Sequence, residues 1–354
     1  MLSQDELNKV WLVIGVTGQD GSWMVESLLE KGYKNIHGTI RRSATFNTSN
    51  IDHIFNKLTL HYADLTDSMN IYTLINKVKP DYIVNFAAMS HVKVSEEISN
   101  YTFQVNTLGV LNILQSVRNL GLDKTCKIYQ ASTSEMFGNN TDGSVLLNEK
   151  SPMNPISIYA ISKKAAQEIC DMYRDAYNMF VVNSVLFNHE GSRRGHTFVT
   201  QKIADYVANY NKTNKSGSDF ISPLQLGNLN ARRDWGSAKN YVEAIYLMLM
   251  QEKPENFVIA TGETHSVREF VELAFKEIGV NIKWEGSGVN EKGIEIDSGK
   301  VIVKVNPKYY RDIDIECLIG DSSKAQKVLG WKPTTTFKEL VNIMVKAAID
   351  RTTN

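Results

Sequence analysis

Short apolar runs alternate with amphipathic segments over the first half of the chain. Val10–Ile14 is an apolar run suited to a strand buried on both faces, and it leads directly into a glycine-rich turn. After the turn, Val25, Leu28 and Leu29 recur at helical spacing, and Gly32 is placed to end that helix. The pattern repeats, with further strands expected at Asn35–Ile40, Leu58–Tyr62, Tyr82–Phe86 and Lys127–Ala131, and a long helix at Tyr101–Leu120.

This alternation of strand and helix predicts an α/β fold with a doubly wound parallel sheet of the Rossmann type. From about Asn188 onward the alternation becomes irregular. We therefore expect a first domain of residues 1–187 and a smaller C-terminal α/β domain of residues 188–354, with some segments of the second returning to the first. Ser266–Glu269 and Thr336–Glu339 are capping boxes that predict the starts of two amphipathic helices in the second half.

The turn after the first strand reads GVTGQDG from Gly15 to Gly21. Strand, glycine turn and helix in this order are the context of a dinucleotide-binding fingerprint. In that interpretation Gly15 permits the tight turn, Gly18 lets the backbone approach a pyrophosphate, and Gly21 lets the helix pack on the strand. The alternative is a tight strand-to-helix connection that binds no ligand.

The ends of the next strands carry residues suited to a phosphorylated dinucleotide. The second strand ends in Arg41-Arg42-Ser43, where a free ribose 2′-OH is usually met by Asp or Glu and a 2′-phosphate by Arg. With no acid at this position, NADP is favoured over NAD; a solvated edge or a subunit contact is the alternative for the two arginines. Asp64, after the third strand, is placed to accept a hydrogen bond from an adenine amine, and the small Ala87, after the fourth, lets backbone approach the cofactor.

Tyr159 and Lys163 are four residues apart, so a helix puts them on one face, about one turn from each other. A free phenol has a pKa of about 10 and is a poor base at neutral pH, whereas a cation held close to it favours the phenolate and lowers that pKa. The pair therefore predicts a tyrosine that exchanges a proton at pH 7. Most such pairs are an aromatic residue beside a solvated lysine, so the case for catalysis depends on Thr133 and Glu135 upstream and on the glycine turn.

Composition limits the classes of partner. The 354 residues are 42% hydrophobic, and 39 basic residues balance 39 acidic ones, which argues against nucleic acid or an anionic membrane as partner. No apolar run approaches the ~18 residues of a membrane span, and the first residues do not read as a secretory signal. Cys126, Cys170 and Cys317 are scattered and suit reduced thiols, so a cytoplasmic location is expected.

Taken together, these residues resemble the extended short-chain dehydrogenase/reductase family, and within it the GDP-mannose 4,6-dehydratase family. The resemblance covers nearly the whole chain. Besides the glycine turn and the Tyr-Lys pair, it is carried by the stretches Arg41–Ser43, Leu60–Ser68, Ser90–Ser95, Gln130–Glu135, Phe187–Glu190, Arg193–Gly195, Phe198–Thr200, Leu226–Leu229, Arg232–Trp235, Ala260–Glu263, His265–Phe270 and Lys308–Arg311.

The resemblance implies roles for the residues that match the family's motifs. The catalytic group would be Thr133, Glu135, Tyr159 and Lys163. NADP would be held by Gly15, Thr17, Gly18, Gln19, Asp20, Gly21, Arg41, Arg42, Ser43, Asp64, Leu65, Ala87, Ser90, Tyr101, Lys163, His189 and Arg194. The substrate GDP-mannose would be held by Asn188, Val199, Lys202, Arg233 and Arg311, mainly from the second domain. No metal is implied, and a homodimer or homotetramer is expected.

The reaction that the resemblance implies is an internal redox cycle with no net oxidation. Tyr159 removes the proton of the hexose 4-OH while hydride passes from C4 to NADP⁺, and Thr133 hydrogen-bonds the 4-oxygen. Glu135 takes the C5 proton and protonates the departing 6-OH, and hydride returns to C6, giving GDP-4-keto-6-deoxy-mannose. A nucleotide-sugar epimerase or another sugar dehydratase would keep the turn and the Tyr-Lys pair, but Glu135 with Arg232–Trp235 argues against it. A protein that only senses NADP would be expected to lack Tyr159 or Lys163.

Two adjacent cations, Arg232 and Arg233, are expected to grip a diphosphate through bidentate, charge-assisted hydrogen bonds. The alternative is a surface ion pair between these arginines and Asp234. Only the first of these interpretations places the pair in a substrate site.

Overall fold

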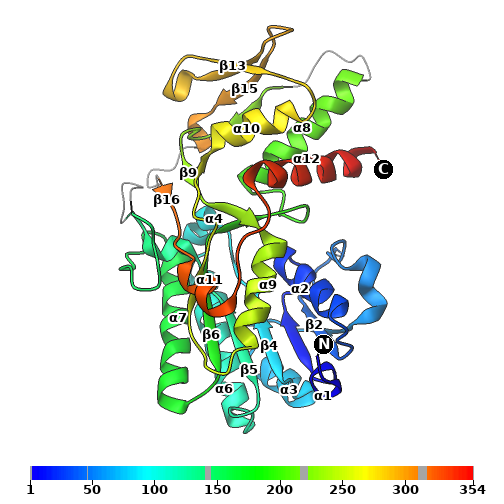
Figure 1. The fold of residues 1–354 in the computed structure, drawn as a ribbon, viewed down its shortest axis with the longest axis vertical. Helices are drawn as coiled ribbons and strands as arrows, with labels where there is room; N and C mark the ends of the chain where they lie inside the picture. The colour runs from blue at the N-terminus through cyan, green and yellow to red at the C-terminus, as the bar shows by residue number, and fades with distance from the viewer. Residues whose placement is uncertain (1, 46, 140–144, 216–221, 310–316, 354) are drawn as a thin grey trace.

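A seven-stranded parallel sheet forms the lower half of the molecule as drawn in Figure 1. The computed structural model describes residues 2–45, 47–139, 145–215, 222–309 and 317–353. The strand order is β11-β6-β5-β4-β1-β2-β3, and every neighbouring pair is parallel. The strands are β1 (Trp11–Ile14), β2 (Ile36–Ile40), β3 (Thr59–Tyr62), β4 (Tyr82–Asn85), β5 (Lys127–Ala131), β6 (Val181–Leu186) and β11 (Phe257–Ile259). The predicted doubly wound sheet is confirmed.

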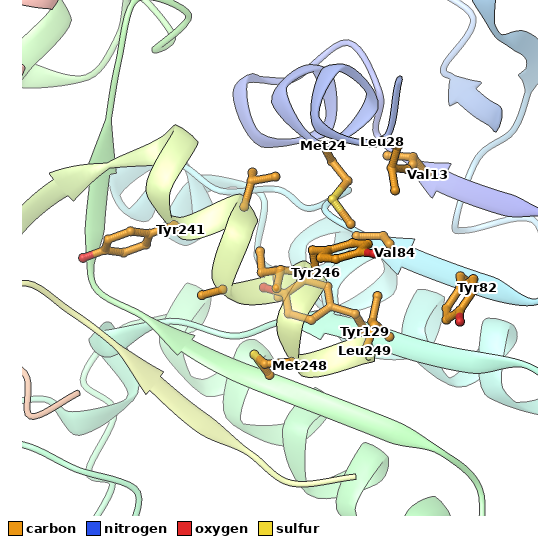
Figure 2. Packing of buried hydrophobic residues seen from close by; sticks show 14 of the residues in the cluster. Val13, Met24, Leu28, Tyr82, Val84, Tyr129, Tyr241, Tyr246, Met248 and Leu249 are labelled. Atoms are coloured by element: carbon orange, nitrogen blue, oxygen red, sulfur yellow. The ribbon is translucent and has the colours of Figure 1, made fainter. Parts of the chain in front are cut away.

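Helices cover both faces of this sheet because alternate strand residues point to opposite sides. Trp11 and Val13 of β1 pack toward α2 (Gln19–Glu30) and α9 (Ala238–Leu249), whereas Leu12 and Ile14 pack toward the other layer. That other layer consists of α3 (Ser68–Val78), α6 (Gly109–Asn119) and α7 (Ile158–Tyr177). Figure 2 shows the first layer, where Met24 of α2 points toward the aromatic rings of Tyr129 and Tyr246 and Leu28 lies beside Val13 of β1.

A second group of elements lies above the carboxyl ends of the strands (Figure 1). A four-stranded sheet, β13-β14-β15-β8, packs with three helices around a separate apolar core. Its strands are β8 (Leu224–Leu226), β13 (Ile282–Glu285), β14 (Lys292–Glu295) and β15 (Val301–Val305), and its helices are α8 (Val199–Lys215), α10 (Val267–Lys276) and α12 (Phe337–Thr353). Ser266 and Glu269 form the predicted capping box of α10, and Thr336 and Glu339 exchange the equivalent bonds at α12.

Two small sheets connect the large sheet and the second group. In one, β7 (Asn188–Glu190) pairs with β10 (Trp235–Ser237). In the other, β9 (Arg232–Arg233) lies between β12 (His265–Ser266) and β16 (Cys317–Leu318). Because β11 belongs to the large sheet, part of the second half of the chain packs with the first half, while the division at residues 187 and 188 stays a prediction.

The long helix predicted from Tyr101 to Leu120 is interrupted. The segment consists of α5 (Ser99–Phe103), a π-helical turn at Gln104–Leu108 and α6, and Gly121 with φ 69° ends it as expected. Periodicity alone does not distinguish a π turn from an α turn, because both keep apolar residues on one face. Asn106, a fully buried amide in this π turn, has a tertiary role described below.

Candidate active site

The glycine turn between β1 and α2 has the backbone that its sequence predicts. Gly15 has φ 85°, and a Cβ there would lie 3.0 Å from the backbone nitrogen of Ala87. A Cβ on Gly21 would lie 2.3 Å from the Gly15 carbonyl oxygen, so only glycine lets α2 approach the strand this closely. At Gly18 the nearest atom to a Cβ would be 3.4 Å away, which is ordinary contact. The fold therefore demands glycine at positions 15 and 21, whereas at position 18 the protein itself leaves room for a Cβ.

The first turn of α2 offers free donors at the same place. Gly18 is the N-cap residue, is exposed and has no side chain with which to cap the free N–H groups. Such groups, with the positive end of the helix dipole, form a site for phosphate. Thr17 is fixed beside them, since its carbonyl accepts a hydrogen bond of 3.0 Å from the Asn50 amide.

Asp20 and His189 form a charged pair beside this turn. His189 Nε2 lies 2.9 Å from Asp20 Oδ2, and Nδ1 lies 2.8 Å from the Phe187 carbonyl oxygen. Because both ring nitrogens face acceptors, the ring satisfies both only as an imidazolium. Burial lowers the pKa of His189, but the Asp20 charge and hydrogen bond more than offset it, so that pKa is raised. The pair connects the start of α2 with β7. Gln19 adds a second connection by donating a hydrogen bond to the His189 carbonyl.

Arg194 occupies the loop that follows β7. Its Nε lies 2.9 Å from Glu190 Oε2, and its guanidinium lies 3.7 Å from the centre of the Phe198 ring. Its positive charge lowers the pKa of Asp20 and partly offsets the effect of burial on the pKa of Tyr159. The structure therefore brings the predicted residues Asp20, His189 and Arg194 together.

The other residues expected to hold a dinucleotide lie at the carboxyl ends of β2, β3 and β4. Arg41 is exposed and its guanidinium donates to the hydroxyl of Tyr101, so two of these residues meet. Arg42 and Ser43 are exposed beside them. Asp64 follows β3 and Leu65 is buried next to it, while Ala87 and Ser90 follow β4. All lie at one edge of a parallel sheet, where doubly wound folds bind ligands.

Tyr159 and Lys163 lie on the first turns of α7, and both are almost fully buried. The start of this helix is fixed by two serines. Ser157 is the N-cap and accepts from the Ala160 N–H, and the buried Ser95 accepts from the Tyr159 N–H at 3.1 Å. Since Ser95 lies on α4 (Val92–Glu97), a second helix sets the position of the tyrosine.

The protonation of the Tyr-Lys pair differs from the expectation. Burial raises the pKa of Tyr159 to about 12, although the hydrogen bond with Thr133 lowers it. Burial also lowers the pKa of Lys163 to about 8, and its ammonium donates to the Ala131 carbonyl at 2.9 Å. The prediction that this lysine by itself lowers the pKa of Tyr159 is wrong for the protein's own groups, because burial outweighs the charges around the phenol.

Thr133 and Glu135 follow β5 and lie beside Tyr159. Thr133 hydrogen-bonds Tyr159 and also accepts from the Glu135 N–H at 3.3 Å. Glu135 is half buried in a short 3-10 turn, Ser134–Phe137, and its charge raises the pKa of Tyr159. The phenol and the hydroxyl are therefore in contact, and the carboxylate is close enough for its charge to act on the phenol, which is a set of groups suited to proton transfer.

Asn106 is a residue of this site that the sequence reasoning missed. Its amide exchanges two hydrogen bonds with the Met89 backbone, at 2.8 and 3.0 Å, and donates to Ser162 at 3.0 Å. Ser162 in turn donates to the Tyr159 carbonyl. Asn106 therefore connects the loop after β4 with the helix that carries the tyrosine, and a π turn places it there. No local sequence signal marks it, since these bonds depend on tertiary contacts.

Arg232 and Arg233 do not act as one clamp. Neighbouring residues of a strand point to opposite faces. Arg232 donates to the hydroxyl and carbonyl of Thr264, and its Nη1 lies 3.7 Å from Glu269 Oε2. Its guanidinium is therefore already bonded within the protein. The alternative of a surface pair with Asp234 is also wrong, because Asp234 is fully buried and accepts four hydrogen bonds, from Thr261 N and Oγ1, Gly262 N and Gly320 N.

The remaining residues expected to hold a substrate come from β7, β9 and α8. Asn188 and Arg233 are partly buried, and Val199 is exposed. Lys202 donates to the Gln225 carbonyl at 2.6 Å, and its ammonium lies 3.9 Å from the centre of the Tyr309 ring. Arg311 lies outside the described residues. Among the residues described, no cluster of three or more His, Cys, Asp or Glu is arranged to hold a metal, and no helix has the length and apolar character to cross a membrane.

Comparison with known proteins extends these observations. The family model described as GDP-mannose 4,6 dehydratase matches residues 12–344. A GDP-mannose 4,6 dehydratase of Drosophila melanogaster is 48% identical over 355 residues, which cover 98% of this chain and 87% of the fly protein. The match therefore includes both the large sheet and the second group of elements.

Solved structures share the fold at lower identity. The UDP-glucose 4-epimerase of Thermus thermophilus in complex with NAD is 25% identical with a TM-score of 0.78, covering 96% of this chain and 98% of that one. The RMD protein of Pseudomonas aeruginosa complexed with NADPH has a TM-score of 0.74 at 19% identity, covering 97% of this chain and all of that one. Both support the fold.

Proposed function

This chain belongs to the GDP-mannose 4,6-dehydratase family. On that premise we propose which residue carries out each step of the reaction. Its activity is that of a hydro-lyase, removing water from the hexose of GDP-mannose to give GDP-4-keto-6-deoxy-mannose. The observation that carries the division of roles is the hydrogen bond of Tyr159 with Thr133, together with the Glu135 carboxylate whose charge acts on the same phenol. The reaction needs proton transfer at the 4-oxygen and at C5, and these groups supply an acid or base for each.

The cofactor is a nicotinamide dinucleotide, and NADP(H) is our specific proposal. The first turn of α2 has uncapped N–H groups, and Gly18 is free of any neighbour that would exclude a Cβ, so both fit a pyrophosphate above the turn. The exposed guanidinium of Arg41, held beside Tyr101, fits a 2′-phosphate. When bound, the cofactor would supply the redox chemistry, taking hydride as NADP⁺ and returning it as NADPH, and the charge of its oxidised form would favour the phenolate of Tyr159.

Tyr159 acts as the base that removes the proton of the 4-OH. Its pKa of about 12 means that the protein alone keeps the phenol protonated at neutral pH. Lys163 is held by the Ala131 carbonyl and has a pKa lowered to about 8, so it is still mostly charged at pH 7. Thr133 hydrogen-bonds the phenol and is placed to share a bond with the 4-oxygen as charge develops there.

Glu135 acts in the elimination. Once C4 is a ketone, the proton on C5 becomes acidic, and a carboxylate beside Thr133 is placed to take it and then to protonate the departing 6-oxygen. Glu135 is only half buried, which leaves it accessible to a hexose.

Arg233 is proposed as the cation that binds the diphosphate of the substrate. Asn188, Val199 and Lys202 are proposed to contact the same substrate, while Arg232 has a structural role. The oligomeric and cytoplasmic states expected from the sequence stay predictions.

The decisive test is incubation of the purified protein with GDP-mannose and NADP⁺. We expect loss of one water per sugar by mass spectrometry, with GDP-glucose and UDP-glucose as control substrates. Recovery of an epimer of unchanged mass would contradict the dehydratase assignment. Equal affinity for NAD⁺ and NADP⁺ in a binding titration would contradict the cofactor proposal alone.

A further inference from the structure

Strands β4 and β5 separate at their carboxyl ends. The two strands are paired with Tyr82 opposite Lys127 and Asn85 opposite Gln130, and the Lys127 N–H donates to the Asp81 carbonyl. In a parallel ladder the bonds recur at every second residue. Continuing this register, the Ala87 N–H would donate to the Ala131 carbonyl, but it donates to the Asn85 side chain instead. Two backbone groups at the candidate site therefore lack the partners that the ladder would provide.

A chain of two buried amides joins these two groups. The Ala87 N–H donates to Asn85 Oδ1 at 3.1 Å, and Asn85 Nδ2 donates to Gln130 Oε1 at 2.7 Å. Gln130 Nε2 then donates to the Ala131 carbonyl at 2.8 Å. The same carbonyl accepts from Lys163 Nζ at 2.9 Å. Asn85 and Gln130 expose only 1% and 2% of their surface, so water does not substitute for them.

The direction of every bond in this chain is fixed by its two ends. A backbone N–H can only donate, so Asn85 must turn its oxygen toward Ala87 and its nitrogen toward Gln130. A carbonyl and an ammonium leave one arrangement at the other end, in which Gln130 donates to Ala131 and Lys163 donates beside it. The Ala87 N–H, the two amides, the Ala131 carbonyl and Lys163 therefore form one ordered network of five groups, in which Gln130 and Lys163 bind the same carbonyl.

We propose that Asn85 and Gln130 are positioning residues for Lys163, an inference that rests on the proposed function of the Tyr-Lys pair. The amides bridge the gap where β4 and β5 diverge and orient the carbonyl that anchors the ammonium. Neither side chain is part of the reacting group itself. Their role is to keep a buried cation in one position without placing an acid beside it, so that Lys163 stays free of a salt bridge that would hold its proton more tightly.

Two variants of Gln130 separate the parts of this role. Gln130→Met keeps the length of the side chain but leaves the Asn85 amide without an acceptor and the Ala131 carbonyl with Lys163 alone. Gln130→Glu keeps the acceptor for Asn85, replaces the donor to the Ala131 carbonyl with an acidic oxygen, and so brings a carboxyl group to the carbonyl that Lys163 binds. Asn183→Leu is the matched control, because Asn183 is a fully buried amide on the neighbouring β6 that bonds Asp171 and Asn256.

The first measurement is steady-state turnover of GDP-mannose by the holoenzyme. We expect Gln130→Met to lower kcat by up to about 100-fold with KM within twofold of wild type, because small displacements of a catalytic group cost that much. Asn183→Leu should lower the melting temperature but keep kcat. A normal kcat in Gln130→Met, or an equal loss of kcat in Asn183→Leu, would overturn the proposal.

The second measurement needs neither cofactor nor substrate. The contribution of Lys163 to the free energy of unfolding should rise with pH between about 8 and 10.5, where Lys163 is neutral when folded but protonated when unfolded. The buried thiols of Cys126 and Cys170, whose pKa burial raises, act in the opposite direction, and Cys170 and Asp20 also act on Lys163. The contribution of Lys163 is therefore measured as the difference between each protein and its Lys163→Met counterpart. Gln130→Glu should flatten this rise, because its carboxylate moves the pKa of Lys163 back toward the ordinary value. An unchanged slope would contradict the proposal. If wild type is inactive toward GDP-mannose, the proposed function fails, and this slope alone decides whether Gln130 and Lys163 are coupled.

Discussion

Tyr159, Lys163 and Thr133, on the large-sheet side of the candidate site, expose only 9%, 3% and 8% of their surface. Each is fixed by hydrogen bonds to the backbone or to another buried side chain. On the opposite side, Arg233 and Lys202 are only partly buried and come from short strands and a helix of the second group. In the proposed division of roles, the reacting groups are buried and held by hydrogen bonds, whereas the groups assigned to the charged substrate are partly solvated.

The largest expected effect is the loss of kcat on removing the hydroxyl of Tyr159, on the large-sheet side of the site. Tyr159→Phe removes the phenolic hydroxyl but little volume, and general-base losses amount to about 10²–10⁴-fold. We expect kcat to fall within that range while the KM for GDP-mannose and the melting temperature change little. Near wild-type turnover in a rapid-quench assay would show that this hydroxyl is not the base.

A pair of glycine variants separates folding from binding at the turn. Gly21→Ala places a Cβ 2.3 Å from the Gly15 carbonyl oxygen, so we expect it to lose stability, by about 1–3 kcal/mol. Gly18→Ala meets only ordinary contacts, so it should keep its melting temperature and lose roughly tenfold or more in NADP⁺ affinity. Calorimetric titration and thermal melts measure both. Full affinity in Gly18→Ala would mean that no ligand approaches the turn closely.

The sequence predicted the framework of this side well. The glycine turn, five of the strands and the spacing of Tyr159 and Lys163 are local patterns, because each is set by residues close together in the chain. The residues that hold the site in place were not predicted. Asn85, Asn106 and Gln130 look like ordinary polar residues in or near apolar segments, and only the packing of separate elements gives them partners.

The sequence also did not predict how the residues on the substrate-binding side are arranged. Arg232 and Arg233 look alike in the sequence, yet Arg232 bonds Thr264 while Arg233 bonds the Arg232 carbonyl, and we assign only Arg233 to the substrate. The small sheets pair segments from distant parts of the chain, so no local periodicity in the sequence predicts these sheets.

That distinction predicts opposite results for two matched variants. Arg233→Gln should raise the KM for GDP-mannose by roughly tenfold or more, since a charge-assisted hydrogen bond contributes about 1.5–3 kcal/mol. Arg233 also donates to the Arg232 carbonyl, so the KM rather than the melting temperature is the diagnostic measurement for this variant. Arg232→Gln should keep the KM and lower the melting temperature, because it loses its bonds to Thr264. The same KM change in both variants would restore the idea of a joint clamp.

A smaller effect concerns pH. Because burial lowers the pKa of Lys163 from 10.5 to about 8, burying its charge costs stability below pH 8, and that cost is relieved as the pH rises toward 10.5. The full difference is roughly 3 kcal/mol, since one pKa unit corresponds to about 1.4 kcal/mol. Lys163→Met should therefore be more stable than wild type at pH 7 and should lose that advantage by pH 10.5. Chemical denaturation at several pH values measures this, and a constant difference would contradict it.

The central claim is that oxidation at C4 and elimination across C5 and C6 are assigned to different residues of one site. GDP-mannose carrying deuterium at C4 tests it most directly, with wild type, Glu135→Gln and Tyr159→Phe compared by mass spectrometry and NMR. Wild type should lose one water and move the deuterium to C6. Glu135→Gln should still remove deuterium from C4 but form little or no 6-deoxy product, whereas Tyr159→Phe should do neither. Normal formation of 6-deoxy product by a folded Glu135→Gln protein would contradict the account, and so would joint loss of both steps together with stability, which would make Glu135 a structural residue.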